Sequence, residues 1–167
     1  RPFGTQLDVR AMGYEWINHS MTPSHLADHD FRIQVGGKAC KHPYNISLFN
    51  VSAMSFGALS GNAIQSLNLG AKMGGFAHDT GEGSISRHHR LHGGDLIWEI
   101  GSGYFGCRDE SGHFSAERFV ENVQTPQVKM VEIKLSQGAK PGHGGVLLGS
   151  KVTEEIAEAR GVAVGED

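Results

Sequence analysis

Two segments constrain the fold of this chain most, because each is an apolar strand that ends in small, amide or basic residues. The first covers residues 46–60 and carries the run SAMSFGALS at positions 52–60. The second covers residues 128–142, where a β-branched run leads into EIKLSQGAKPG at positions 132–142. Strands of a parallel α/β sheet have this pattern, since their apolar parts are buried and polar groups gather at their carboxyl ends. We therefore predict a parallel sheet with a ligand site at its carboxyl edge.

The sequence between these segments predicts repeated strand–helix units. Ser60 suits a helix N-cap, and Gly74 and Gly75 end that helix before a short strand over residues 76–79. The run TGEGS at positions 80–84 then predicts a tight loop whose amides can point at a ligand. The other elements expected are strands over 31–35, 46–53 and 128–135, a short helix around Leu96, Ile97 and Ile100, a helix over 116–123 capped by Ser115, and a helix from Thr153 to Gly161.

The length of the chain allows either a smaller fold or part of a larger one, and we favour the second. A complete (β/α)8 barrel needs about 250 residues, whereas this chain has 167. We predict an α/β chain that forms a partial TIM (β/α)8 barrel, with about the first three βα units, preceded by an irregular N-terminal arm. The arm is expected over residues 1–45, and residues 46–167 form the N-terminal part of the barrel.

Composition narrows the function classes. The net charge is −3 and the isoelectric point is near 6.4, and no basic run suggests binding to nucleic acid or to a membrane surface. Cys40 and Cys107 are too few and too far apart for a disulfide framework or a CxxC site. No stretch reaches the roughly 20 apolar residues of a spanning helix, and no signal-peptide pattern opens the chain. We expect a small-molecule site and a cytoplasmic location, with an upstream membrane anchor left open.

Four ordered strings resemble the FMN-binding domain family of glutamate synthases, and most closely its stand-alone FMN-binding branch. These strings are SAMSFGALS at 52–60, GFAHDTGEG at 75–83, GSGYFGCRD at 101–109 and IKLSQGAKPGHGG at 133–145. The resemblance implies a TIM-type barrel that holds FMN at the carboxyl ends of its strands. It implies that Lys134, the expected catalytic residue, and Gln137 reach the flavin ring, where a cation or amide donor stabilises the anionic reduced flavin. The other cofactor-binding residues expected are Ser52, Ala53, Met54, Ser55, Gly81 and Glu82.

The same resemblance implies an anionic substrate, 2-iminoglutarate formed from 2-oxoglutarate and ammonia, held by Ser55, Lys140 and Arg160. Three positions depart from the family pattern: Asn62 replaces a glutamate, Val146 a glutamine and Tyr104 an arginine. Each lost partner of a buried polar substrate costs about 1 to 3 kcal/mol, so the departures affect the dicarboxylate substrate more than the flavin. Iron–sulfur cysteines of family members would follow residue 167, and neither the electron donor nor the cluster content follows from the sequence.

Other interpretations of the same residues remain open at this stage. Lys134 could extend from a strand end with no role in catalysis. The chain could be a catalytically incomplete barrel fragment, whose sheet edge is covered by the remainder of the barrel or by a second copy. A metal-dependent hydrolase would instead use the spacings His25-x3-His29 and His88-His89 with His92, but no HExxH motif accompanies them. We expect no metal site.

Overall fold

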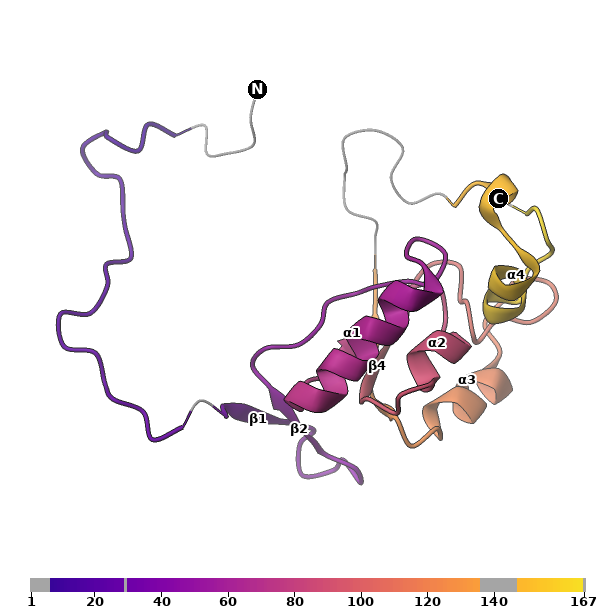
Figure 1. Cartoon of the computed structure of the whole chain (residues 1–167), viewed down its shortest axis with the longest axis horizontal. Helices are drawn as coiled ribbons and strands as arrows, with labels where there is room; N and C mark the ends of the chain where they lie inside the picture. Colours follow the sequence, from indigo (N-terminus) through magenta and orange to yellow (C-terminus); the bar gives the residue numbers. More distant parts are fainter. Residues whose placement is uncertain (1–6, 29, 136–146, 167) are drawn as a thin grey trace.

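A three-stranded parallel sheet forms the centre of the computed structural model, which describes residues 7–28, 30–135 and 147–166. The strands β3 (His78–Asp79), β4 (Leu96–Ile100) and β5 (Val128–Ile133) lie side by side in chain order. Helix α2 (Arg87–Arg90) connects β3 to β4, and α3 (Ala116–Val123) connects β4 to β5. The chain is therefore a mixed α/β protein built of βα units, as predicted, with α1 (Gly61–Gly74) preceding β3 (Figure 1).

Strand β4 corrects the prediction of a short helix around Leu96, Ile97 and Ile100. All five residues of β4 are buried, and the strand pairs with β3 on one side and β5 on the other. A short apolar run that is buried on both faces has no alternation, so its periodicity does not distinguish a strand from a helix. The flanking glycines, Gly94 and Gly101, were the better guide, since five residues are too few for a typical helix.

The strand expected over residues 46–53 is wrong in its extent. Tyr44–Ser47 forms β2, which pairs antiparallel with β1 (Arg32–Val35). The chain then turns, and Val51 alone makes a parallel bridge to His78 of β3. The start of the apolar run therefore belongs to the antiparallel hairpin, and only its end lies beside the parallel sheet.

The helix boundaries follow the predicted caps. Side-chain oxygens of Ser60, Ser115 and Thr153 accept hydrogen bonds from the third backbone N–H of α1, α3 and α4 (Glu154–Arg160), respectively. Gly75 and Gly161 end α1 and α4 in left-handed conformations, with φ of 67° and 69°. A 3₁₀ turn (Gly149–Lys151) precedes α4.

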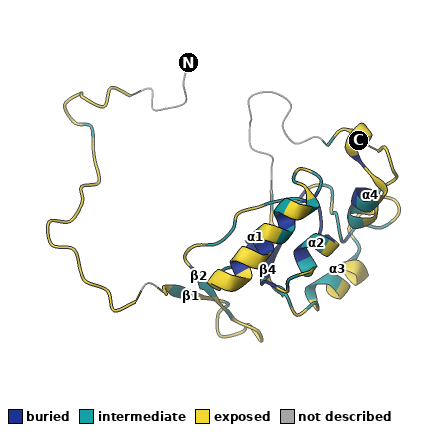
Figure 2. Cartoon of the chain, in the orientation of Figure 1, coloured by how far each residue is buried: buried dark blue, intermediate teal, exposed yellow. Residues whose placement is uncertain are grey.

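Two clusters of buried side chains hold these elements together. Figure 2 shows buried residues along α1, β4 and α4. The first joins α1 to α4, and the second joins β4 to the underside of α3, where Trp98 stacks on Phe119 at a centroid distance of 5.7 Å. The first contains Phe56, Ile64, Val152, Ile156 and Ala157; the second contains Ile85, Leu96, Trp98, Ile100 and Cys107. Since α4 packs on Phe56 and α1, it lies next to the segment that follows Val51.

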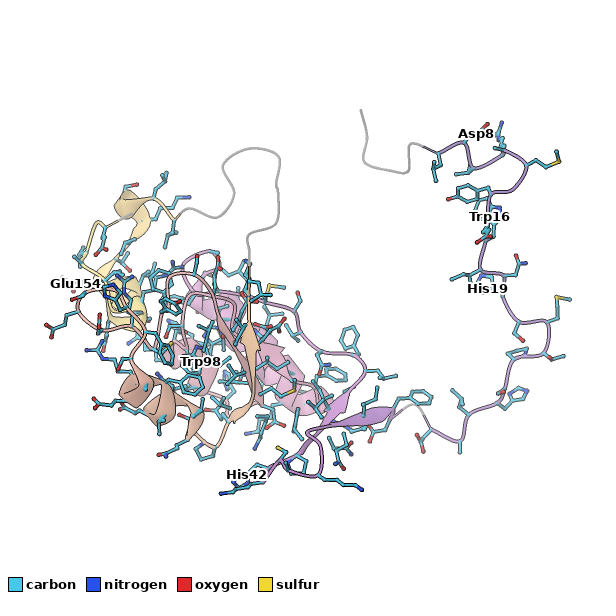
Figure 3. The ribbon with its side chains drawn as sticks, turned by 180° about the vertical axis from the view of Figure 1, so that it is seen from behind. Asp8, Trp16, His19, His42, Trp98 and Glu154 are labelled. Atoms are coloured by element: carbon cyan, nitrogen blue, oxygen red, sulfur yellow. The ribbon has the colours of Figure 1, made fainter. Side chains whose placement is uncertain are left out.

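The N-terminal segment is separate from this core. Within residues 7–28 the chain forms no helix or strand, and its side chains are almost all exposed. In Figure 3, Asp8, Trp16 and His19 lie along this segment, far from Trp98 in the core. Residue 45 lies within the hairpin β1–β2. Tyr44 connects this hairpin to the core, because its hydroxyl donates to Asp95 Oδ2 at 2.8 Å. Among the described residues, no helix has the length and apolar character needed to cross a membrane.

Candidate functional site at the carboxyl edge of the sheet

Residues 51–55 run alongside β3 and bring the first predicted string to the carboxyl edge. Asp79 N donates to Val51 O at 3.0 Å, and Met54 N donates to Asp79 O at 3.2 Å. Between these two hydrogen bonds, Ser52 and Ala53 are exposed, while Met54 and Ser55 are partly buried. The string SAMS therefore presents two small exposed residues, Ser52 and Ala53, at the end of the parallel sheet.

Gly81 fixes the distance between this segment and the loop after β3. Its φ is +65°, and a Cβ at this position would lie 2.7 Å from Ser55 N. Asp79 Oδ1 accepts from Gly81 N at 2.8 Å, which holds the loop in place. Only glycine suits both the left-handed backbone and the close approach, so the structure brings Ser55 and Gly81 together as expected.

Lys134 and Glu82 meet at the same edge. The Lys134 ammonium lies 3.4 Å from Glu82 Oε2, and the two side chains are 31% and 26% exposed. Lys134 N donates to Ile100 O at 2.9 Å, so the residue continues the pairing of β5 with β4 just beyond the end of β5. Glu82 also packs against Gly101, where a Cβ would collide with its carboxylate. Lys134 is therefore held by a charge pair, and it does not extend freely into solvent.

Arg160 reaches this cluster from the last turn of α4. Its Nη2 donates to Phe56 O at 3.4 Å, and its guanidinium lies over the Phe105 ring at 5.1 Å. A Cβ on Gly83 would lie 3.1 Å from Arg160 Nη2 and 3.2 Å from Ser55 Cβ, so all three residues are neighbours. Burial lowers the pKa of Arg160, and the Glu82 carboxylate opposes that shift. The cation is thus partly desolvated, a state in which it attracts an anion strongly.

Five other predicted positions are either outside the described residues or make different contacts. Gln137, Lys140 and Val146 lie outside the described residues. Asn62 is exposed near the start of α1. Tyr104 has a φ of +51° in the loop after β4, and its ring packs edge-on against Phe114.

Three carboxylates that sequence reasoning missed lie on the sheet below this cluster. Oxygens of Asp79, Glu99 and Glu132 all lie within 4.8 Å of one another. Burial, a hydrogen bond with Glu132 and the charge of Glu99 raise the pKa of Asp79 to about 7. Burial also raises the pKa of Glu99, against the opposing charge of Lys134. The trio could have been found only by aligning the strands in register, because Glu99 lies opposite Glu132 in the β4–β5 pair.

Two histidines, His78 and His89, are buried next to this edge of the sheet, and His89 contacts the SAMS segment. His89 Nε2 lies 3.0 Å from Met54 O, and its Nδ1 lies 2.9 Å from Ser86 Oγ. Burial lowers the pKa of His78 and of His89 to about 4, so both rings are neutral at pH 7. His88 bonds Gln65 at 2.6 Å and Glu155 at 2.6 Å instead. His25 lies in the irregular segment over residues 7–28, and His29 falls outside the described residues.

The site therefore combines the exposed residues Ser52 and Ala53, a lysine held by a glutamate and a partly desolvated arginine. Such a set can bind an anionic ligand and stabilise negative charge that develops on it. The carboxylate trio below can take up or release a proton near neutral pH, since the pKa of Asp79 is about 7.

Comparison with known proteins shows the family of the chain. A family described as a conserved region in glutamate synthase matches residues 19–167. The glutamate synthase large subunit-like protein YerD of Bacillus subtilis is 41% identical over 134 residues, which cover 79% of this chain and 25% of that protein. An archaeal-type glutamate synthase [NADPH] of Thermotoga maritima is 40% identical over 116 residues, or 70% of this chain and 20% of the relative. A glutamate synthase large subunit-like protein of Rhizobium meliloti is 30% identical over 139 residues, which cover 83% of this chain and 28% of that protein.

The chain thus spans about a quarter of the length of the relatives it matches. The match includes the whole described sheet together with Ser55, Lys134 and Arg160. The chain belongs to the glutamate synthase family, through the region that this family conserves.

Proposed function

We propose that this chain forms the N-terminal part of the TIM-type barrel of an FMN-dependent oxidoreductase of the glutamate synthase type. The observation that carries the proposal is the convergence of Ser55, Gly81, Glu82, Lys134 and Arg160 at the carboxyl edge of a parallel sheet. In barrel enzymes the carboxyl edge is where substrates and cofactors bind. The names of the relatives, which are glutamate synthases or resemble their large subunit, support the reaction class.

The described residues fit a flavin. The close approach of Gly81 to Ser55 packs the loop after β3 directly against the SAMS segment, so both segments would lie at one ligand site. Ser52 and Ala53 are exposed in this segment, and Lys134, at the carboxyl edge of the same sheet, is partly exposed. Backbone amides and a cation are the groups that would hold an isoalloxazine ring and stabilise its anionic reduced form. Gln137 would add an amide donor.

FMN, when bound, would supply a hydride to an electron-poor C=N or C=O carbon. The chain's own residues would bind and orient that carbon. Arg160, partly buried and stacked on Phe105, would pair with a carboxylate of an anionic substrate such as 2-iminoglutarate, and Ser55 would fix its orientation. Lys140 would supply a second cation. Glu82 would keep Lys134 in position at 3.4 Å.

The visible absorption spectrum tests the cofactor. We would purify the chain and, in parallel, the chain extended to the length of its relatives, add FMN, and remove unbound flavin by gel filtration. Flavin bands retained by the extended chain would support the oxidoreductase. Absence of flavin from both would contradict it and would favour an assembly unit without catalysis.

A pair of lysine variants tests the role of Lys134 within the extended chain. Lys134→Met removes the cation at the carboxyl edge, whereas Lys129→Met removes a lysine of the same strand that lies 3.8 Å from Asp95 at the other end. We expect Lys134→Met alone to weaken FMN binding and to lower the flavin reduction potential, because the anionic reduced form loses its counter-charge. If both variants had the same flavin affinity and reduction potential, Lys134 would have no role in binding or tuning the flavin.

A further inference from the structure

His88 is a histidine that the proposed function leaves without a role, and it lies where several segments of the chain meet. It belongs to α2, and its side chain is only 12% exposed. Its ring packs on the Phe56 ring at a centroid distance of 4.7 Å, and its Nδ1 lies 2.6 Å from Gln65 Nε2 of α1. Its Nε2 lies 2.6 Å from Glu155 Oε1 of α4. One largely buried side chain therefore contacts α1, α4 and the residue that follows the SAMS string.

The surroundings of His88 are shaped for an imidazole ring. A Cβ at Gly61, the first residue of α1, would lie 2.5 Å from His88 Cε1 and 2.6 Å from its Nε2, so a side chain there would collide with the ring. A buried polar ring is stable when its nitrogens are paired. Because the amide nitrogen of Gln65 only donates, Nδ1 accepts, and the ring proton lies on Nε2, which faces Glu155. His88 therefore directs one nitrogen at α1 and the other at α4.

The contact between His88 and Glu155 joins α4 to α2. The apolar side of α4, Ile156 and Ala157, packs in the buried cluster that also contains residues of α1. Glu155 precedes these two residues and reaches α2, where its other partner is Arg87. The Arg87 side chain is 75% exposed, and exposed ion pairs contribute little to stability. We therefore expect the buried partner, His88, to account for most of this polar attachment.

The attachment of α4 matters for the carboxyl edge because Arg160 lies in the last turn of this helix. Arg160 Nη2 donates to Phe56 O at 3.4 Å, and His88 packs on the ring of the same phenylalanine. We propose that His88 is a positioning residue that fixes α4, and with it Arg160, at the carboxyl edge of the sheet. It acts through its contact with Glu155. The consequence for the reaction rests on the proposed function, whereas the attachment of α4 does not.

Two substitutions of His88 separate the roles of its two nitrogens. The amide of a glutamine reaches the position of Nε2, so His88→Gln keeps a donor for Glu155. The shorter asparagine places its amide near the position of Nδ1, so His88→Asn keeps a partner for Gln65 and leaves Glu155 without its buried donor. Glu155→Ala breaks the same contact from the side of α4. Glu154→Ala, at an exposed position of the same helix, is its matched control.

Hydrogen–deuterium exchange and arginine modification follow α4 directly in the extended chain, with no ligand added. Mass spectrometry of peptides gives the exchange rate of the α4 amides, and α3 is the reference because it packs against the other buried cluster. Phenylglyoxal modifies accessible guanidinium groups. The modification rate of Arg160, which is partly buried, is compared with that of Arg10, which is exposed in the N-terminal segment.

We expect His88→Asn and Glu155→Ala to speed both exchange in α4 and modification of Arg160 at least about tenfold, with α3 and Arg10 unchanged. His88→Gln and Glu154→Ala should stay close to the parent. Faster exchange in α3 as well as in α4 would indicate a general loss of stability and would overturn the positioning role. Equal rates in His88→Asn and His88→Gln, or unchanged rates in Glu155→Ala, would overturn it too. If the extended chain bound no flavin, the proposed oxidoreductase would fail, while these rates would still decide the role of His88.

Discussion

At the scale of single residues, Gly81 joins the backbone of the predicted ligand loop to that of the SAMS segment. In Gly81→Ala the new Cβ would lie 2.7 Å from Ser55 N, and the alanine would have to keep a φ of +65°. Gly161→Ala is the matched control, because its φ is +69° and no atom lies within 4 Å of the added Cβ. We expect Gly161→Ala to lower the free energy of unfolding by about 1 to 2 kcal/mol and Gly81→Ala to lower it by about 1 to 3 kcal/mol more, measured by urea unfolding. Equal losses would mean that the loop moves away from Ser55 without cost.

Asp79 gives the stability a pH dependence at the same scale. Its pKa rises from 3.8 to about 7 in the folded chain, so the folded state binds a proton that the unfolded state has released. This contribution is complete below pH 3.8 and is lost as the pH rises through 7, at up to about 1.4 kcal/mol per pH unit. His78 and His89, with pKa values lowered to about 4, act in the opposite direction, since their contribution is lost as the pH falls below 6.5.

Asp79→Asn isolates the contribution of the aspartate. The amide resembles the protonated carboxyl and can still accept from Gly81 N, and both histidines are unchanged. We expect the free energy of unfolding of Asp79→Asn minus that of the parent to be larger at pH 7 than at pH 4, measured by urea unfolding at both pH values. Glu110→Gln, at an exposed position, should show no such trend. A constant difference between Asp79→Asn and the parent would contradict the raised pKa.

At the scale of elements, Asn68 attaches α1 to the loop before β4. It is fully buried, its Oδ1 accepts from Gly94 N at 3.0 Å, and its Nδ2 lies 3.5 Å from His78 Nδ1. Asn68→Ala would leave the Gly94 N–H buried without this acceptor and should cost about 1 to 3 kcal/mol of stability. Asn62→Ala, at an exposed position of the same helix, should change it by less than about 0.5 kcal/mol. Thermal and urea unfolding of the two variants would show whether the helix is held by this polar contact or by apolar packing alone.

The elements also show what sequence reasoning could and could not find. Caps and glycine stops are local signals, so α1, α3 and α4 were predicted with their N-caps. The nature of β4 depends on burial on both faces, which comes from neighbours far along the chain, and its apolar run therefore suggested a helix. The pairing of Glu99 with Glu132 depends on the register of two strands, so the carboxylate trio appears only in three dimensions. Ser55, Gly81, Lys134 and Arg160 were named from a family resemblance, and their proximity came from the fold.

At the scale of the whole molecule, β5 ends the described sheet with an apolar edge. It pairs with β4 alone among the described strands. Ile133, its last residue, is 69% exposed, and Leu135, two residues further on, is 92% exposed. A sheet edge with unpaired backbone groups and apolar side chains recruits other strands. We therefore expect the chain by itself to associate with increasing concentration in sedimentation velocity, and the double variant Ile133→Lys, Leu135→Lys to shift it toward an 18.0 kDa monomer. Met12→Lys with Ile17→Lys introduces the same charges at exposed apolar positions of the N-terminal segment and should leave association unchanged. If the variant of the N-terminal segment abolished association and the β5 variant did not, the N-terminal segment would make the contact between chains. That result would contradict the prediction that a further strand pairs with the β5 edge in the proposed barrel.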